Sequence, residues 1–152
     1  MRAPSAVELL LLLLNVGASF FMAGLIWVMQ VVHYPLFALV GRAEFRAYED
    51  AHTRRITWLV GPGMLLGLLS AGALVFVRPA AIPLAAPLAG LALLLVSLVS
   101  TALVQGPAHG RLGASFDTAV HRGLVRSNWV RTAAWSAQAL VAAFMLWRAA
   151  GG

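Results

Sequence analysis

Four histidines are the residues of this chain best suited to chemistry near neutral pH: His33, His52, His109 and His121. Imidazole exchanges protons in this pH range and also binds haem iron and other metals. We therefore predict that all four are candidate acid–base groups. His33 and His109 are also the candidate ligands if a haem or another metal is bound. The alternative interpretation is that these histidines belong to polar loops and have no chemical role.

Polar residues near the histidines predict how a substrate would be held. Tyr34, Arg55, Asn128 and Arg131 are expected to orient it, with Gln30 and Gln105 as further binding residues. Arginine, tyrosine and amide side chains suit an anionic or phenolic molecule or a quinone headgroup.

Two other interpretations of these polar residues stay open. The arginines would instead reach lipid headgroups, and the amides would hydrogen-bond between helices. The acidic residues are expected to pair with loop arginines on solvated faces; they are Glu44, Glu49, Asp50 and Asp117.

The composition excludes several classes of protein. Hydrophobic residues make up 61% of the 152 residues and charged residues only 11%, whereas soluble domains are about 45–50% apolar. The chain contains no cysteine, which excludes disulfides, iron–sulfur clusters, zinc–thiolate sites and cysteine nucleophiles. No nucleic-acid-binding motif accompanies the formal charge of +6.

Long apolar segments predict an all-α membrane protein. A spanning helix needs about 20 apolar residues, and four segments approach this length: 9–32, 56–77, 80–104 and 130–147. The last is short and spans only if Arg131 extends its guanidinium towards the interface. Residues 33–55 and 105–129 are expected to be helical connections, with Ser115 as a helix cap. The sequence thus predicts one domain, residues 1–152, built as a four-helix bundle in the lipid bilayer.

Arginine placement predicts the orientation in the membrane. Eight of the eleven arginines lie in the two connections or at the entry to the last apolar segment; these are Arg42, Arg46, Arg54, Arg55, Arg111, Arg122, Arg126 and Arg131. Basic residues favour the cytoplasmic side. We therefore expect both connections in the cytoplasm and both termini outside, in the inner membrane of a bacterium.

The two halves of the sequence resemble each other faintly. Each apolar segment that precedes a connection ends in glutamine, followed by histidine and proline. The matched pairs are Gln30 with Gln105, His33 with His109, and Pro35 with Pro107. This pattern indicates two related helix hairpins.

Three short motifs resemble a family of four-helix membrane proteins of unknown function that includes the fungal anthrone oxygenases. They are Ala23-Gly24 with Gln30-Val31-Val32-His33-Tyr34-Pro35-Leu36, then Pro107-Ala108-His109-Gly110-Arg111-Leu112, and the segment from Trp129 to Thr132. The resemblance covers most of the chain. It implies the four-helix fold and oxidation of a flat phenolic or polycyclic molecule.

Three classes of function follow from these observations. The first is a membrane oxidoreductase that acts on a hydrophobic aromatic or quinone-like molecule in a cytoplasm-facing pocket. The second is a non-catalytic subunit or scaffold. The third is a small-solute carrier, which would need a polar path through the outer half, where only Asn15 and Ser19 are obvious. Small residues in the apolar segments are also compatible with a homo-oligomer.

Overall fold

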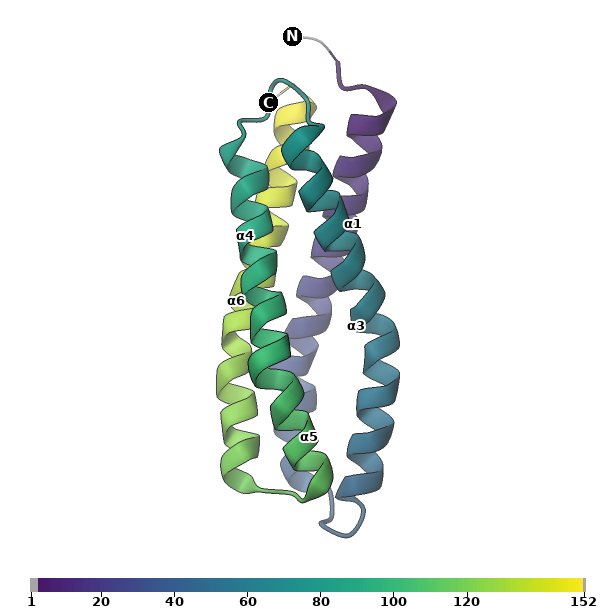
Figure 1. Cartoon of the computed structure of the whole chain (residues 1–152), viewed down its shortest axis with the longest axis vertical. Coiled ribbons are helices and arrows are strands. Elements are labelled where there is room, and N and C mark those ends of the chain that lie inside the picture. Colours follow the sequence, from purple (N-terminus) through teal and green to yellow (C-terminus); the bar gives the residue numbers. More distant parts are fainter. Residues whose placement is uncertain (1–2, 152) are drawn as a thin grey trace.

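The computed structural model describes residues 3–151 and shows four long helical rods packed antiparallel (Figure 1). The first rod is α1 (Ala6–Val28), which continues through a π-helical turn (Met29–His33), α2 (Tyr34–Leu36) and a 3₁₀ turn (Phe37–Leu39). No strand occurs in this part of the chain. The prediction of an all-α bundle is confirmed.

The other three rods complete the bundle. The second is α3 (Phe45–Phe76), a single helix that Pro62 does not interrupt. The third is α4 (Ala85–Ser100), followed by a π-helical turn (Thr101–Gln105) and α5 (Gly106–Ala114). The fourth is α6 (Thr118–Ala149), whose N-terminus is capped by Asp117 and not by Ser115.

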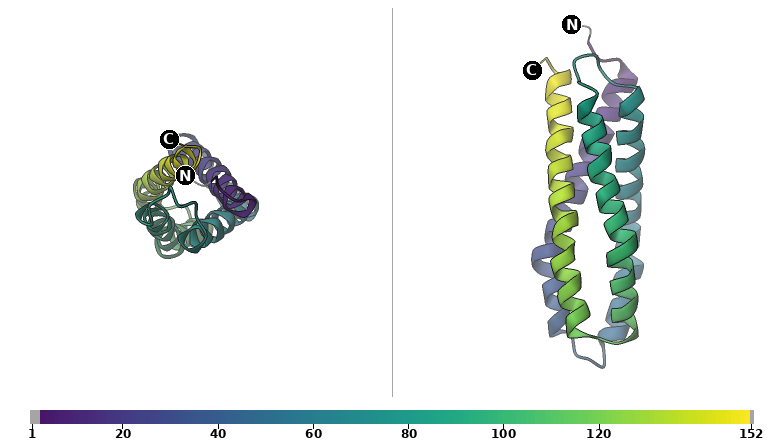
Figure 2. Two further views of the ribbon diagram at one scale, coloured as in Figure 1. Left: turned by 90° about the horizontal axis from the view of Figure 1, so that it is seen from above. Right: turned by 60° about the vertical axis from the view of Figure 1, so that its left-hand side comes forward.

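The rods occupy the corners of a square when viewed along the bundle axis (Figure 2). Helix α1 packs on α3 and α6, and α4 also packs on α3 and α6. The pairs α1/α4 and α3/α6 are therefore diagonal. The start of α1 and the end of α6 lie at one end of the bundle, and the connections 40–44 and 115–117 lie at the other (Figure 1).

The outer surface of the bundle is apolar, as a lipid-embedded protein requires. Among the described residues, three rods are long and apolar enough to cross a membrane: 6–39, 45–76 and 85–114. Large apolar side chains point outwards, including Trp58, Leu69, Phe76 and Leu140. Helix α6 lies alongside these rods over the same length (Figure 1) but is less apolar, because it carries several arginines. The protein is a membrane-embedded helical bundle.

The third rod begins later than the apolar pattern predicts. Residues 80–84 form a connection instead of helix, and α4 starts at Ala85. Two arginines hold this connection against the end of the bundle: Arg78 donates to the carbonyl of Ile82, and Arg148 donates to the carbonyl of Ala81. Ile82 is buried there. These contacts outweigh the helix preference of the alanines.

The two π-helical turns occupy matching places in the two halves. Pro35 is the sixth residue after the start of the first turn, and Pro107 is the sixth after the start of the second. The helix that follows each hairpin connection has 32 residues. The structure thus contains two related hairpins. In this register Pro35 again corresponds to Pro107, whereas His33 corresponds to Gln105 and not to His109.

A buried polar network ties three rods together in the half of the bundle farther from the connections 40–44 and 115–117. Asn15 Nδ2 donates to Ser70 Oγ at 3.1 Å, and Gln138 Nε2 donates to Asn15 Oδ1 and to Ser19 Oγ, each at 3.3 Å. All four side chains are buried. Asn15 and Ser19 therefore bond within the bundle and do not line a solute path, which is how polar residues join helices in lipid.

Candidate functional site

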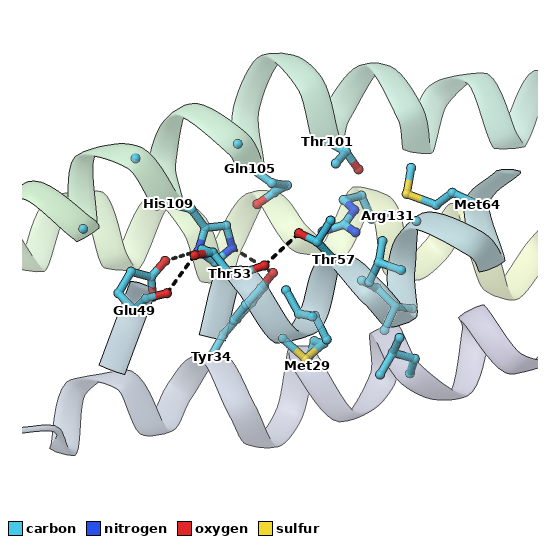
Figure 3. Close-up of a pocket in the computed structure, with 18 of the residues that line it drawn as sticks. Met29, Tyr34, Glu49, Thr53, Thr57, Met64, Thr101, Gln105, His109 and Arg131 are labelled. Carbon is cyan, nitrogen blue, oxygen red and sulfur yellow. Dashed lines mark hydrogen bonds and ion pairs between the residues drawn. The ribbon is translucent and has the colours of Figure 1, made fainter. Parts of the chain in front are cut away.

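A cavity of about 760 Å³ opens between α3 and the rod formed by α4 and α5 (Figure 3). Apolar side chains line the part nearest the middle of the bundle; these include Met22, Ile26, Met29, Ile56, Val60 and Met64. Polar side chains line the part nearest the connections 40–44 and 115–117; these include Tyr34, Glu49, Thr53, Gln105 and His109. Arg131 lies farther in, on the side of Met64 (Figure 3). Its volume and its uneven polarity are those of a small-molecule site.

Three polar side chains at the cavity form a continuous hydrogen-bonded chain from three different rods. Glu49 Oε1 lies 2.5 Å from His109 Nδ1, and His109 Nε2 lies 3.1 Å from the hydroxyl of Tyr34. Figure 3 shows the imidazole ring between its two partners. An ionised carboxylate only accepts hydrogen bonds, so His109 Nδ1 carries the hydrogen and Nε2 is left to accept from Tyr34.

Glu49 is only 1% exposed, and its contact with His109 becomes an ion pair when the imidazole takes up a proton. A buried carboxylate needs a partner of this kind, because unpaired burial of its charge costs several kcal/mol, about as much as the whole stability of many domains. The arrangement of carboxylate, imidazole and hydroxyl is typical of acid–base machinery, in which the carboxylate orients the ring and stabilises its protonated form.

Local sequence explains why these side chains meet. Tyr34 directly follows the first π-helical turn and precedes Pro35, while His109 follows the second π-helical turn and Pro107. Each π turn adds a residue to the helix and so rotates everything after it by about 100°. Glu49 lies on the same face of α3 as Thr53 and Ile56, which also line the cavity.

Arg131 supplies a buried positive charge at the back of the same cavity. It is 4% exposed, its Nη1 donates to Asn128 Oδ1 at 3.1 Å, and its guanidinium lies beside the hydroxyl of Tyr34. Its Nε has no partner among the described residues. The expectation that Arg131 extends to the membrane surface is therefore wrong, because the side chain turns into the bundle.

Gln30 and Asn128 hold Arg131 in place from outside the cavity lining. Gln30 donates to the carbonyl of Val125 and accepts from Asn128 Nδ2 at 2.9 Å, which joins the first π turn to α6. Asn128 then accepts from Arg131. These two amides were expected to contact a substrate; the structure places them behind the arginine that does line the cavity.

His33 and His52 form a second hydrogen-bonded pair on the other side of α3. His33 Nε2 lies 2.9 Å from His52 Nδ1. Both rings line a groove of about 320 Å³ on the surface between α1 and α3, together with Tyr48 and Arg55. Arg55 is thus separated from the cavity that contains Arg131.

His121 supports the backbone of Tyr34. Its Nε2 lies 2.8 Å from the carbonyl oxygen of Tyr34, and its ring packs against Phe37 and Phe116. Because a carbonyl only accepts, His121 Nε2 carries the hydrogen. The ring is buried and does not line the cavity.

The structure brings four of the sequence-predicted site residues into the cavity: Tyr34, Gln105, His109 and Arg131. Glu49 is the residue that the sequence analysis misplaced, since it was expected on a solvated face. A signal for it exists in the sequence. Glu49 stands three residues before His52, so the two side chains lie near each other on one helix, and a carboxylate next to a candidate histidine is a candidate partner.

The histidines do not fit a metal or haem site. No group of three or more His, Asp or Glu side chains among residues 3–151 is placed to hold a metal ion. Both ring nitrogens of His109 are engaged, by Glu49 and by Tyr34. A metal at His109 would have to break the hydrogen-bonded chain.

Comparisons of the chain with protein-family models, with curated proteins and with solved structures give no match.

Proposed function

We propose that this protein binds a hydrophobic aromatic or quinone-like molecule in the cavity and promotes its oxidation by acid–base catalysis. The observation that carries the proposal is the chain from Glu49 through His109 to the hydroxyl of Tyr34, at the polar end of an otherwise apolar cavity. The loose resemblance to the family that includes anthrone oxygenases points to the same class of substrate.

In the proposed reaction Tyr34 receives the proton of a substrate hydroxyl as its own proton passes to His109 Nε2. The imidazolium formed is stabilised by Glu49, which already accepts from Nδ1. The substrate oxyanion lies near Arg131, a preorganised positive charge in a site of low dielectric constant.

The deprotonated substrate is the form that loses electrons readily. A hydroquinone that becomes a quinone releases two protons and two electrons in all. Dioxygen that accepts both becomes hydrogen peroxide, so the atoms and electrons balance. The protein contributes the base, the oxyanion partner and the apolar enclosure.

The polarity of the cavity determines how the substrate lies in it. Its hydroxyl end fits beside both Tyr34 and Arg131, and its ring body fits against Met22, Met29 and Met64. Methionine side chains adapt their shape and pack well against aromatic rings. A flat, weakly acidic, membrane-soluble molecule satisfies both ends of the cavity.

Binding and deprotonation can be tested with 2-naphthol, a phenolic probe whose naphtholate absorbs at longer wavelength. The protein in lipid nanodiscs is expected to bind the probe and raise its ionised fraction at neutral pH. Y34F and H109Q should each abolish that increase. Y48F is the matched control, because Tyr48 is the second of the two tyrosines and lies in the outer groove. An equal ionised fraction in Y34F and wild type would overturn the assignment of Tyr34.

Turnover is tested separately by dioxygen consumption with hydroquinones and hydroxylated polycyclic aromatics in the same nanodiscs. General acid–base groups contribute about 10²–10⁴-fold, so Y34F should lose at least about a hundredfold of the catalysed rate. If wild type binds and ionises the probe but oxidises no compound of this class, the protein is a non-catalytic binding subunit.

We further propose that the end of the bundle with the histidines faces the cytoplasm, in an inner membrane. The arginine-rich connections support this orientation. Because the chain has no cysteine, A43C and A80C each introduce one reactive thiol, in the connections at opposite ends. A membrane-impermeant maleimide added to intact cells should label A80C and leave A43C unlabelled; the reverse labelling would invert the orientation.

A further inference from the structure

A second group of histidines borders the cavity from the other side of α3. His52 is buried, its Nδ1 is hydrogen-bonded to His33, and its Nε2 has no partner among the described residues. The His52 ring lies 5.4 Å from the His109 ring, centroid to centroid. His33 is partly exposed and lines the groove between α1 and α3.

These positions form an ordered series from the surface to the site. It runs from the groove to His33, then to His52, and then to His109 and its partner Glu49. Every neighbouring pair is in hydrogen-bond contact except His52 and His109. On the site side of that gap, Glu49 Oε2 is also buried and has no partner among the described residues.

We propose that His33 and His52 form a proton path that connects the Glu49–His109–Tyr34 chain to water at the groove between α1 and α3. An imidazole ring accepts a proton at one nitrogen and releases one from the other, so a hydrogen-bonded pair of rings transfers protons across its length. One bridging water between His52 Nε2 and Glu49 Oε2 would satisfy both buried atoms, which is where buried waters are found.

The path serves a need that the proposed function creates, and it rests on that function. Glu49 is 1% exposed and the His109 side chain only 13%, and a bound substrate covers the cavity side. A proton taken from the substrate must therefore leave by another route before the next turnover. The His33 groove is on the opposite side of α3 from the cavity, so a bound substrate leaves it open.

Other ionisable groups surround His52 and set the field along the path. On α3 they are Tyr48, Glu49 and Arg55. The first rod contributes His33 and Tyr34. Helix α5 contributes His109, and α6 contributes Arg131, which lies beside Tyr34. Glu49 is the only carboxylate of this set. It therefore attracts a proton inwards, whereas the arginines oppose accumulation of positive charge on the histidines.

The experiment measures the rate at which bound 2-naphtholate is protonated, and the ionised fraction of bound 2-naphthol at equilibrium is its control. Wild type in lipid nanodiscs is loaded with 2-naphthol, and a laser pulse releases protons from a caged acid. The rate at which bound naphtholate is protonated is then followed by absorbance. H52Q should lower this rate at least about tenfold and leave the ionised fraction at equilibrium unchanged. R126Q, which removes an exposed arginine of α6 that lines neither the groove nor the cavity, should leave the rate unchanged.

Chemical rescue provides a second, independent test. H33A should slow protonation in the same way, and free imidazole in the buffer should restore the rate, since the groove beside His33 is open to solvent. Imidazole should restore H52Q much less than H33A, because His52 is more buried than His33 in the wall of that groove. Equal rates in wild type, H52Q and H33A overturn the path. A wild type that fails to bind or ionise 2-naphthol overturns the proposed function instead, so the two failures are distinguishable.

Discussion

His109 Nδ1 lies 2.5 Å from Glu49 Oε1, a contact that joins residues 60 positions apart on α5 and α3. It is the link between the single buried carboxylate of the described residues and the hydroxyl of Tyr34. Because the pair lies beside an apolar cavity, any molecule bound there meets a polarised hydroxyl at one end and hydrocarbon at the other. The function we propose follows from this relationship.

Glu49 should determine how strongly the site ionises a bound phenol. We expect E49Q to move the ionisation midpoint of bound 2-naphthol towards alkaline pH. Hydrogen bonds to charged groups contribute about 1.5–3 kcal/mol, which corresponds to about one to two pH units. Absorbance titration of the nanodisc complex measures the midpoint. E44Q alters an exposed carboxylate at the start of α3 and should leave the midpoint unchanged; an equal shift in both variants contradicts the assignment.

Arg131 should strengthen ligand binding and lower the thermal stability of the protein. We expect R131Q to weaken binding of 2-naphtholate at alkaline pH by about tenfold or more, because a charge-assisted contact is lost. Removing a buried charge that has no carboxylate partner should leave Tm unchanged or higher. Titration and thermal unfolding test the two effects separately. R126Q removes an exposed arginine of the same helix as the control, and tighter naphtholate binding by R131Q would refute the proposed role.

Gly90 should be needed for the packing of α4 against the buried polar network of Asn15, Ser19, Ser70 and Gln138. A Cβ at this position would stand 2.6 Å from Gln138 Oε1, and the Gln138 amide is held by Asn15 and Ser19. We expect G90A to lower the free energy of unfolding by about 1–3 kcal/mol, as overpacking does. G24A adds the same methyl group where nothing lies within 4 Å and should stabilise α1 slightly. Unfolding in mixed detergent micelles measures both, and equal effects would contradict the packing argument.

The cap of α6 should make stability fall in acid. Backbone hydrogen bonds from Val120 and Ala119 hold the pKa of Asp117 below its ordinary value of 3.8. A carboxyl group with a lowered folded-state pKa stabilises the fold above its ordinary pKa, and this contribution is lost as the pH falls through the folded-state value.

We therefore expect D117A to lower Tm at pH 7, and the difference from wild type to shrink towards pH 3. Thermal unfolding of the detergent-solubilised protein at both pH values measures this change. S115A removes the hydroxyl that sequence analysis expected to cap the helix and should have no effect. A larger loss in S115A than in D117A would show that the cap has been misassigned.

Local properties of the sequence were sufficient to predict the fold class. Apolar length predicts the helical rods, because a helix in lipid must be long and uniformly apolar wherever it faces hydrocarbon. The sequence also placed the histidines and most of the arginines at one end. The sequence pattern predicted that the third rod begins at residue 80, whereas α4 begins at Ala85, and it predicted the wrong cap for α6. Both features depend on contacts with the rest of the bundle.

Within the candidate site, residue types and their positions along the chain identified Tyr34, His109, Gln105 and Arg131. Which of them share a cavity depends on how each helix is rotated about its axis, and a single added residue changes that rotation by about 100°. The two π-helical turns make such a change just before Tyr34 and before His109. For this reason only the tertiary structure shows that Glu49 is buried against His109 and that Arg131 points inwards. It also shows that His33 and His52 line a separate groove, between α1 and α3.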